Sequence, residues 1–270
     1  MKVAGLTSGI SRTATISAEA YIGAGVSIGP GAVVEAGAHL EDGVQIGPMA
    51  VICGSVRLGS GVLVFPHAVI GADPQIRSPE PAVGGKTDIG AETILREGVT
   101  VHCGTEGRST VIGADCLLMA NSHIAHDCQI GDGVVISHAA ALGGHVTVGD
   151  NATIGGLAGV HQWVRIGELA MLGALAKATR DILPMTLADG NPAVHCRINS
   201  VRLERHRIDA DNQRAITQAL AALAAGQDIT EHPETGSIGT FLRAPSHRGL
   251  AAFGPVRDDA RHLGRRSASP

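Results

Sequence analysis

The stretch that decides the fold is residues 16–46, ISAEAYIGAGVSIGPGAVVEAGAHLEDGVQI, in which an aliphatic residue recurs every six positions. The residue two before each aliphatic is Ala or Val, and Gly often follows it. The same phase holds from Ile10 to Ile70, returns at Ile89, and runs again from Ile112 to Leu172. Because this repeat organises most of the chain, it indicates the fold more strongly than local secondary-structure propensity does.

A period of six fits neither an α-helix nor a simple strand, whose side chains repeat about every 3.6 and 2.0 residues. It suits a short strand and a tight turn, with the aliphatic side chain inward and Gly serving the turn. Three such units close a triangular coil, and stacked coils bury a continuous core. The sequence therefore predicts an all-β solenoid, a parallel β-helix of about eight coils. We expect it to span residues 1–183, interrupted by loops at 72–88 and 103–110.

After Leu172 the repeat fades, and the composition changes. Residues 184–250 are expected to form a small C-terminal α-helical region. Within it, residues from about 199 to 225 are rich in Ala, Leu, Arg and Gln, which favours a helix. Residues 251–270 end in GRRSASP and are expected to be a disordered tail.

Composition argues against several classes of protein. The net charge is −4 with no dense basic block, which argues against a nucleic-acid surface. No stretch is long and apolar enough to span a membrane, and the first residues lack a sustained apolar signal region. The five Cys form no CxxC pair, and Cys116 and Cys128 fall at inward positions of the repeat. We therefore expect a cytoplasmic protein whose cysteines include core residues.

Three histidines are expected on one side of the coil. When the chain is divided into six-residue units from Ile112, His126, His145 and His161 fall in units that stack on the same side of three successive coils. None is at an inward position, so they could line one outer groove, and His123 borders the same side. With 13 His in the chain, chance alignment is the alternative. Asp127 favours a functional role, because a carboxylate beside a His orients the ring.

Several motifs resemble the UDP-N-acetylglucosamine O-acyltransferases of lipid A synthesis. They are NSHIAHDC (121–128), LGGHV (142–146), GVHQW (159–163), DGNPAVHCRINSVRLER (189–205), GADPQ (71–75), ILREGVTVHCGT (94–105) and FLRAPSHRGL (241–250). The likeness covers roughly residues 10 to 250. It implies a left-handed β-helix, which the period alone does not give, and a homotrimer with active sites in clefts between neighbouring prisms.

Carried to the matching positions, the resemblance implies that His126 is the general base, Asp127 its orienting partner, and the backbone N–H of Gly144 the oxyanion donor. The substrate-binding residues that it implies are Gln75, His123, His145, His161, Ala174, Asn199 and Arg205. It also implies that acyl carrier protein delivers a (3-hydroxy)acyl group, as a phosphopantetheine thioester, to a nucleotide sugar such as UDP-N-acetylglucosamine. Such chemistry needs a base near pH 7 and a fixed N–H donor, but no metal and no bound cofactor.

Three positions depart from the pattern of this family. Residues 76–78, IRS, stand where Asp-Leu-Lys is usual, so the contacts with the acceptor have changed. Pro192 stands where His is frequent. Ala174 stands where long-chain members have Gly in the acyl groove. In a close-packed groove one added methyl group reduces the space for the acyl chain, so we expect a preference for short or medium acyl groups.

Other functions stay open at this point. An acyl-carrier-protein-dependent O- or N-acyltransferase acting on an amino sugar or a small metabolite would use the same chemistry. A carbonic-anhydrase-like zinc β-helix enzyme would need a His pair five apart, and no pair within the predicted β-helix has that spacing. A non-catalytic scaffold would leave His126–Asp127 beside Gly144 unexplained.

Overall fold

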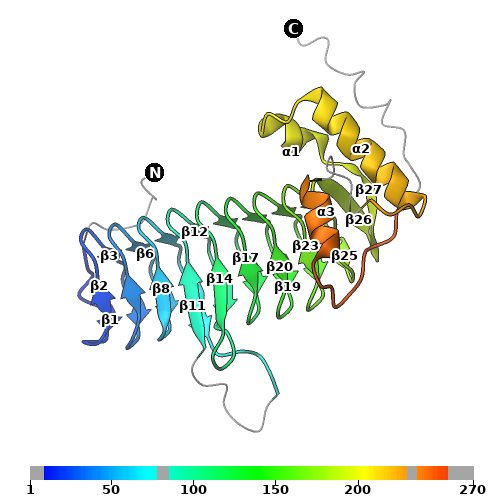
Figure 1. The fold of residues 1–270 in the computed structure, drawn as a ribbon. Coiled ribbons are helices and arrows are strands. Elements are labelled where there is room, and N and C mark those ends of the chain that lie inside the picture. Colours follow the sequence, from blue (N-terminus) through cyan, green and yellow to red (C-terminus); the bar gives the residue numbers. More distant parts are fainter. Residues whose placement is uncertain (1–8, 78–84, 230–235, 255–270) are drawn as a thin grey trace.

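The computed structural model describes residues 9–77, 85–229 and 236–254, and its main feature is a long coil of short parallel strands (Figure 1). Nearly every strand pairs with the strand three further along the chain, so the coils build three sheets that run along the coil axis. We name these sheets A, B and C. The observed architecture is the predicted parallel β-helix.

The strands of each sheet follow in spatial order. Sheet A contains β3 (Ser27–Ile28), β6 (Gln45–Ile46), β9 (Leu63–Val64), β12 (Ile94–Leu95), β15 (Leu117–Leu118), β18 (Val135–Ile136), β21 (Thr153–Ile154), β24 (Met171–Leu172), β26 (Thr186–Gly190) and β27 (Ala193–Ile198). Sheet B contains β1 (Thr15–Ile16), β4 (Val33–Val34), β7 (Val51–Ile52), β10 (Val69–Ala72), β13 (Thr100–His102), β16 (His123–Ile124), β19 (Ala141–Leu142), β22 (Gly159–Val160) and β25 (Lys177–Ala178). Sheet C contains β2 (Tyr21–Ile22), β5 (His39–Leu40), β8 (Val56–Leu58), β11 (Lys86–Ile89), β14 (Ser109–Ile112), β17 (Gln129–Ile130), β20 (Thr147–Val148) and β23 (Arg165–Ile166).

The core of the coil is the stack of inward aliphatic residues. Ile112, Ile130 and Val148 occupy the same register in successive strands of sheet C, and each is at most 3% exposed. Cys116 and Cys128 are buried at the small inward positions, as expected. Because neighbouring strands lie only about 4.8 Å apart, each inward side chain contacts its equivalents in the next coils. The stack therefore fixes the register of every coil.

The chain leaves the coil at two places. One segment lies between β10 and β11; of it, residues 73–77 and 85 are described, and 78–84 lie outside the described residues. The other, residues 103–108, lies between β13 and β14. Both predicted loops extended too far, because residues 86–88 and 109–110 already pair as strands. Pairing in sheet C thus begins before the inward aliphatic residue that marks each repeat.

The C-terminal region begins with a β-hairpin that the sequence did not indicate. Strand β26 pairs in parallel with β24, Met171 opposite Leu187, so it extends sheet A beyond the last full coil. Strand β27 returns antiparallel to β26, and the Asn191–Pro192 peptide between them is cis. The sequence did not indicate this hairpin because strand propensity does not identify the segment with which a strand pairs.

Three helices follow the hairpin: α1 (Ser200–Arg205), α2 (Ala210–Ala224) and α3 (Gly236–Arg243). The predicted helix from about 199 to 225 is therefore two helices. The chain turns between them at Arg207, whose φ is 59°. The Asp209 side chain then caps α2 by accepting from the N–H of Asn212 at 2.8 Å.

The helices pack on the end of the coil through a second, smaller core. Its buried members are Leu183, Met185, Leu203, Ile216, Leu220, Ile229 and Ile238. Of the predicted disordered tail, residues 255–270 lie outside the described residues, whereas Phe253 pairs with His195 of β27. Among the helices in the described parts of the chain, none combines the length and the apolar character needed to cross a membrane.

Replacing Ile130 with Asp should unfold the coil. The side chain is 3% exposed and surrounded by aliphatic residues, so an ionised carboxylate would lie unpaired in an apolar core. We expect loss of the circular dichroism spectrum and of cooperative melting. The control is Gln129→Asp, one residue earlier on the exposed outer face of the same strand. An Ile130→Asp protein that melts like the Gln129→Asp protein would contradict the inward assignment.

Candidate active site

The predicted histidines lie at three stacked turns that follow β16, β19 and β22 of sheet B. His126 lies next to Gly144, and Gly144 next to Gln162, in one column of the turns. The backbone holds this column, because the N–H of His145 donates to the carbonyl of His126, and the N–H of Trp163 to that of Gly144, each at 3.0 Å. The three histidines thus lie at stacked turns of successive coils, but they do not line one groove: His126 and His161 line one cavity, and His145 lines a separate hollow.

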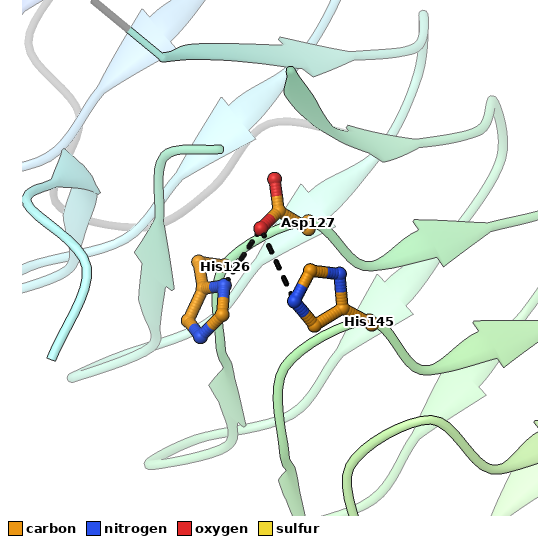
Figure 2. Close-up of side chains that lie close together, drawn as sticks. All are labelled: His126, Asp127 and His145. Atoms are coloured by element: carbon orange, nitrogen blue, oxygen red, sulfur yellow. Dashed lines mark hydrogen bonds and ion pairs between the residues drawn. The ribbon is translucent and has the colours of Figure 1, made fainter. Parts of the chain in front are cut away.

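The neighbouring column contains Asp127, His145 and Trp163, all in the left-handed region with φ between 60° and 67°. Non-glycine residues are uncommon there, and Asp tolerates it better than most. The Asp127 carboxylate lies beside the preceding ring, with Oδ2 2.8 Å from Nδ1 of His126 (Figure 2). Nε2 of His145 lies 3.6 Å from the same oxygen. One carboxylate thus lies between two imidazoles.

The Asp127 carboxylate is buried, with its side chain 3% exposed. Thr105 donates to it through its backbone N–H at 2.9 Å and through its hydroxyl at 3.0 Å. Burial disfavours the ionised form, but the hydrogen bonds from His126 and Thr105 outweigh this effect and lower the pKa of Asp127. An ionised Asp127 requires the proton of neutral His126 on Nδ1, which leaves the lone pair of Nε2 free to accept a proton.

Gly144 allows the backbone to approach this base. A Cβ atom at Gly144 would lie 2.6 Å from Nε2 and Cε1 of His126, closer than carbon contacts allow. Among the described residues, no acceptor is recorded for the N–H of Gly144. A backbone donor is therefore available beside the ring, where an oxyanion would need it.

A cavity of about 620 Å³ opens on the His126 side of the turns. Its lining includes the polar residues Gln75, His102, His123, His126 and His161, and the apolar residues Leu142, Leu157, Val160 and Leu175. The hydroxyl of Thr100 lies 2.8 Å from Nδ1 of His123 and fixes that ring. Burial, with the neighbouring His102, lowers the pKa of His123, which favours its neutral form. The cavity thus joins a base and polar contacts to an apolar channel.

His145 faces the other side of the turns. Its ring stacks on Trp163, with centroids 3.7 Å apart and planes 5° from parallel. Together with Asp127, Arg108 and His247 these side chains line a second hollow of about 460 Å³. Burial lowers the pKa of His145 although Asp127 acts in the opposite direction. His145 is therefore a neutral ring that packs behind the His126–Asp127 pair.

Similarity to known proteins agrees with this geometry. Residues 109–144 match the bacterial transferase hexapeptide family, and residues 181–251 match the second domain of UDP-N-acetylglucosamine O-acyltransferase. The acyl-[acyl-carrier-protein]–UDP-N-acetylglucosamine O-acyltransferase of Paracoccus denitrificans is 36% identical over 181 residues, which are 63% of this chain and 69% of that protein. The chain belongs to the UDP-N-acetylglucosamine O-acyltransferase family. The corresponding protein of Agrobacterium fabrum is 35% identical, with 66% of its length covered.

Solved structures of the family extend the likeness to nearly the whole chain. The UDP-N-acetylglucosamine acyltransferase of Campylobacter jejuni is 31% identical, with a TM-score of 0.83, and 91% of this chain and 100% of that one are covered. The enzyme of Bacteroides fragilis is 30% identical, also with a TM-score of 0.83, over 89% and 98% of the two chains. The fold class is a left-handed parallel β-helix with a small C-terminal helical region.

The structure brings together some of the predicted site residues and separates others. Gln75, His123 and His161 line the cavity of His126. Asn199 and Arg205 lie elsewhere, in a hollow of about 370 Å³ against the outer face of sheet A. This separation within one chain is consistent with a site shared between copies.

The predicted groove residue Ala174 also lies outside the cavity wall. It is exposed on the turn after β24, whereas the next residue, Leu175, does line the cavity.

Two site residues were missed by the sequence analysis. Thr105 lies in the segment 103–108 and holds Asp127, and His102 lies beside His123, with ring centroids 5.1 Å apart. Both lie within the quoted motif ILREGVTVHCGT, which marked them only as part of a resemblance. His102 also contacts the backbone carbonyl of Asp73 through Nδ1, which ties the segment containing Gln75 to the coil.

One group in the described part of the chain could hold a metal ion. His126, Asp127 and His145 each offer a ligand atom, and these atoms lie within 4.8 Å of one another. A metal bound to Nδ1 of His126 would replace that atom's hydrogen bond to Asp127. The observed His126–Asp127 hydrogen bond is an arrangement that a general base uses.

Replacing Asp127 with Asn should lower stability in a pH-dependent way. The folded pKa of Asp127 is below its unfolded value of about 3.9, so its contribution is present above that pH and is lost as pH falls through the folded pKa. Thermal melts from pH 7 to pH 2 should show a gap between wild type and variant that is constant above about pH 4 and narrows as the pH falls further. Asp115→Asn is the control, because Asp115 occupies another left-handed turn position but is exposed. An Asp127→Asn gap that stays constant with pH would contradict the assignment.

Proposed function

We propose that this protein transfers a (3-hydroxy)acyl group from acyl carrier protein to a hydroxyl group of a nucleotide sugar, UDP-N-acetylglucosamine. The observation that carries the proposal is the His126–Asp127 hydrogen bond, with Gly144 against the free edge of the His126 ring, beside a cavity that is polar in one part and apolar in another. The names of the relatives support this choice of donor and acceptor.

The reaction uses groups of this chain at each step. Nε2 of His126 takes the proton of the acceptor hydroxyl, and the oxygen attacks the thioester carbon. The N–H of Gly144 donates to the oxyanion of the tetrahedral intermediate. The intermediate collapses and releases the phosphopantetheine thiolate, which receives the proton from the His126 imidazolium. Asp127 stabilises the imidazolium between these two transfers.

The two parts of the cavity suggest where each substrate binds. Gln75, His102 and His123 offer hydrogen-bonding groups for a sugar, whereas Leu157 and Leu175 offer apolar surface for an acyl chain. The acyl donor is the phosphopantetheine thioester of acyl carrier protein, and no bound cofactor enters the reaction. The substrates belong to the cytoplasm, where we place the enzyme.

The outer face of sheet A supports a homotrimer. Its outward side chains, in register from strand to strand, form an apolar row that only Thr153 interrupts: Leu63, Ile94, Leu117, Val135, Thr153, Met171 and Leu187. Apolar rows of this length on an outer face mark protein interfaces. Asn199 and Arg205 border the same face, so an assembly through it would bring them toward the cavity of a neighbouring copy.

The direct test is mass spectrometry of the products from acyl carrier protein loaded with 3-hydroxyacyl groups. UDP-N-acetylglucosamine, its 3-amino analogue and a free amino sugar are supplied as competing acceptors. We expect an ester of UDP-N-acetylglucosamine, and loss of about 10²–10⁴-fold in rate for His126→Ala, because the general base is removed. The control is His138→Ala, an exposed His at a turn on another side of the coil. Activity of His126→Ala within a few-fold of wild type, or acylation of only the amine, would reject the proposal.

The assembly is tested by light scattering after gel filtration. Wild type should have the mass of three chains, and Leu117→Asp with Val135→Asp should have the mass of one, because two charges would interrupt the apolar row. Both positions are only partly buried within the chain, so the circular dichroism should persist. Val111→Asp, which lies on the outer face of sheet C, is the control and should remain trimeric. A wild-type monomer would reject the assembly without affecting the chemistry.

A further inference from the structure

The second hollow, of about 460 Å³, is separate from the catalytic cavity. The two have no lining residue in common. The catalytic cavity lies along the outer face of sheet B, whereas the second hollow lies over the outer face of sheet C, where Arg108, Pro245 and His247 also line it. The hollow is therefore a second candidate site, and no step of the proposed reaction takes place in it.

The floor of the hollow is polar. Gln129, Thr147 and Arg165 project outward from β17, β20 and β23 and stand in register on neighbouring strands. Nε2 of Gln129 donates to the carbonyl of Ser109 at 2.8 Å, which leaves the amide oxygen of Gln129 available as an acceptor. In the described part of the chain, no partner is recorded for the Thr147 hydroxyl. The floor thus offers donors and acceptors to a ligand that carries hydroxyl groups.

Arg165 is a fixed donor at one end of this floor. Its Nε donates to Oδ2 of Asp181 at 2.7 Å, and its Nη1 donates to the carbonyls of Phe241 and Ala244 at 3.1 and 3.2 Å. The guanidinium also lies over the Phe241 ring, 4.2 Å from the centroid. Within the described residues no acceptor is recorded for Nη2. A donor held in this way binds a ligand without first losing conformational freedom.

Arg108 supplies a charge that no described residue neutralises. Its side chain is exposed, and no ion pair is recorded for it in the described ranges. Among the residues that line the hollow, only Asp127 is acidic, and its oxygens already accept from Thr105 and His126. A guanidinium with free donors matches the oxygens of an anion in pairs. The hollow therefore attracts an anionic group.

The remaining lining indicates the rest of the ligand. Trp163 stacks on His145 on one face, and His247 packs on it with centroids 4.5 Å apart, so the indole is already in contact with two other rings. This arrangement disfavours a ligand that binds by aromatic stacking. The volume equals that of roughly fifteen water molecules at about 30 Å³ each, which is more than an inorganic ion fills. A small polar molecule fits these features.

We propose that the second hollow binds a phosphorylated sugar, with its phosphate between Arg108 and Nη2 of Arg165 and its hydroxyl groups on Gln129 and Thr147. A phosphate monoester offers three acceptor oxygens, one more than a carboxylate, so it can accept from two guanidinium groups at once. This site goes beyond the proposed function and does not depend on which acceptor the enzyme uses.

The experiment measures ligand binding to the whole chain by two methods. Trp163 is the only Trp of the sequence and lines the hollow, so intrinsic fluorescence reports on this place. Calorimetry gives the affinity independently of any change in emission. The probes are glucose 6-phosphate, glucuronate, glucose and inorganic phosphate. We expect glucose 6-phosphate to bind most tightly, at least about tenfold more tightly than inorganic phosphate because of the added hydroxyl contacts, and glucose not to bind.

Two variants test the two parts of the site. Arg108→Gln should weaken binding of glucose 6-phosphate by about tenfold or more, because a hydrogen bond to a charged group is lost. Thr147→Val keeps the shape of the side chain and should weaken binding of glucose 6-phosphate only, with inorganic phosphate unaffected. Arg57→Gln is the matched control, because Arg57 also projects outward from sheet C but pairs with Glu41. Melting temperatures confirm that each variant folds.

A further control separates the two cavities. His123 lines the catalytic cavity and not the second hollow, so His123→Ala should bind glucose 6-phosphate like wild type. Loss of binding in His123→Ala, or unchanged binding in Arg108→Gln, would remove the ligand from the second hollow. Equal affinity for glucuronate would overturn the choice of phosphate. No binding of glucose 6-phosphate by either method at millimolar concentration would reject the site, whatever reaction the enzyme catalyses.

Discussion

The stacking of inward aliphatic side chains from coil to coil is the interaction on which the rest of this structure depends. Ile112, Ile130 and Val148 illustrate it, because each occupies the position of its equivalent one coil away. The contacts are apolar and close, so a coil cannot shift in register without exposing its aliphatic residue. A rigid register then gives every outward side chain a fixed height and side. Catalytic groups from separate coils can therefore meet with little further adjustment.

The active-site turns use this rigidity to hold an unfavourable arrangement. Asp127, His145 and Trp163 all adopt left-handed backbone conformations, which cost free energy in residues other than Gly. The paired strands on both sides of each turn offset this free-energy cost. What the turn gains is a carboxylate against Nδ1 of the preceding His126, in a buried place where Thr105 completes its hydrogen bonds. The same carboxylate in water would orient a ring only weakly.

The two sides of the turns divide the chemistry. On one side, His126 faces a cavity that both polar and apolar side chains line. On the other side, His145, Trp163 and His247 stack behind Asp127 and exclude much of the solvent. The C-terminal segment takes part in both, since Arg248 contacts His161 while His247 packs on Trp163. The helical region is therefore connected to the catalytic coil through side chains as well as through the hairpin.

The sequence by itself determined the coil, its inward positions and the stacked turns that contain His126, His145 and His161; that His145 faces away from the other two emerged only from the structure. It could do so because each unit of strand and turn has six residues, so the position of a residue in the sequence gives its side of the coil. Counting fails wherever the chain leaves the repeat. Only the tertiary structure placed Thr105 against Asp127 and Ala174 outside the cavity wall. It also decided the hairpin of β26 and β27 and the break between α1 and α2, because these depend on contacts with residues far away in the sequence.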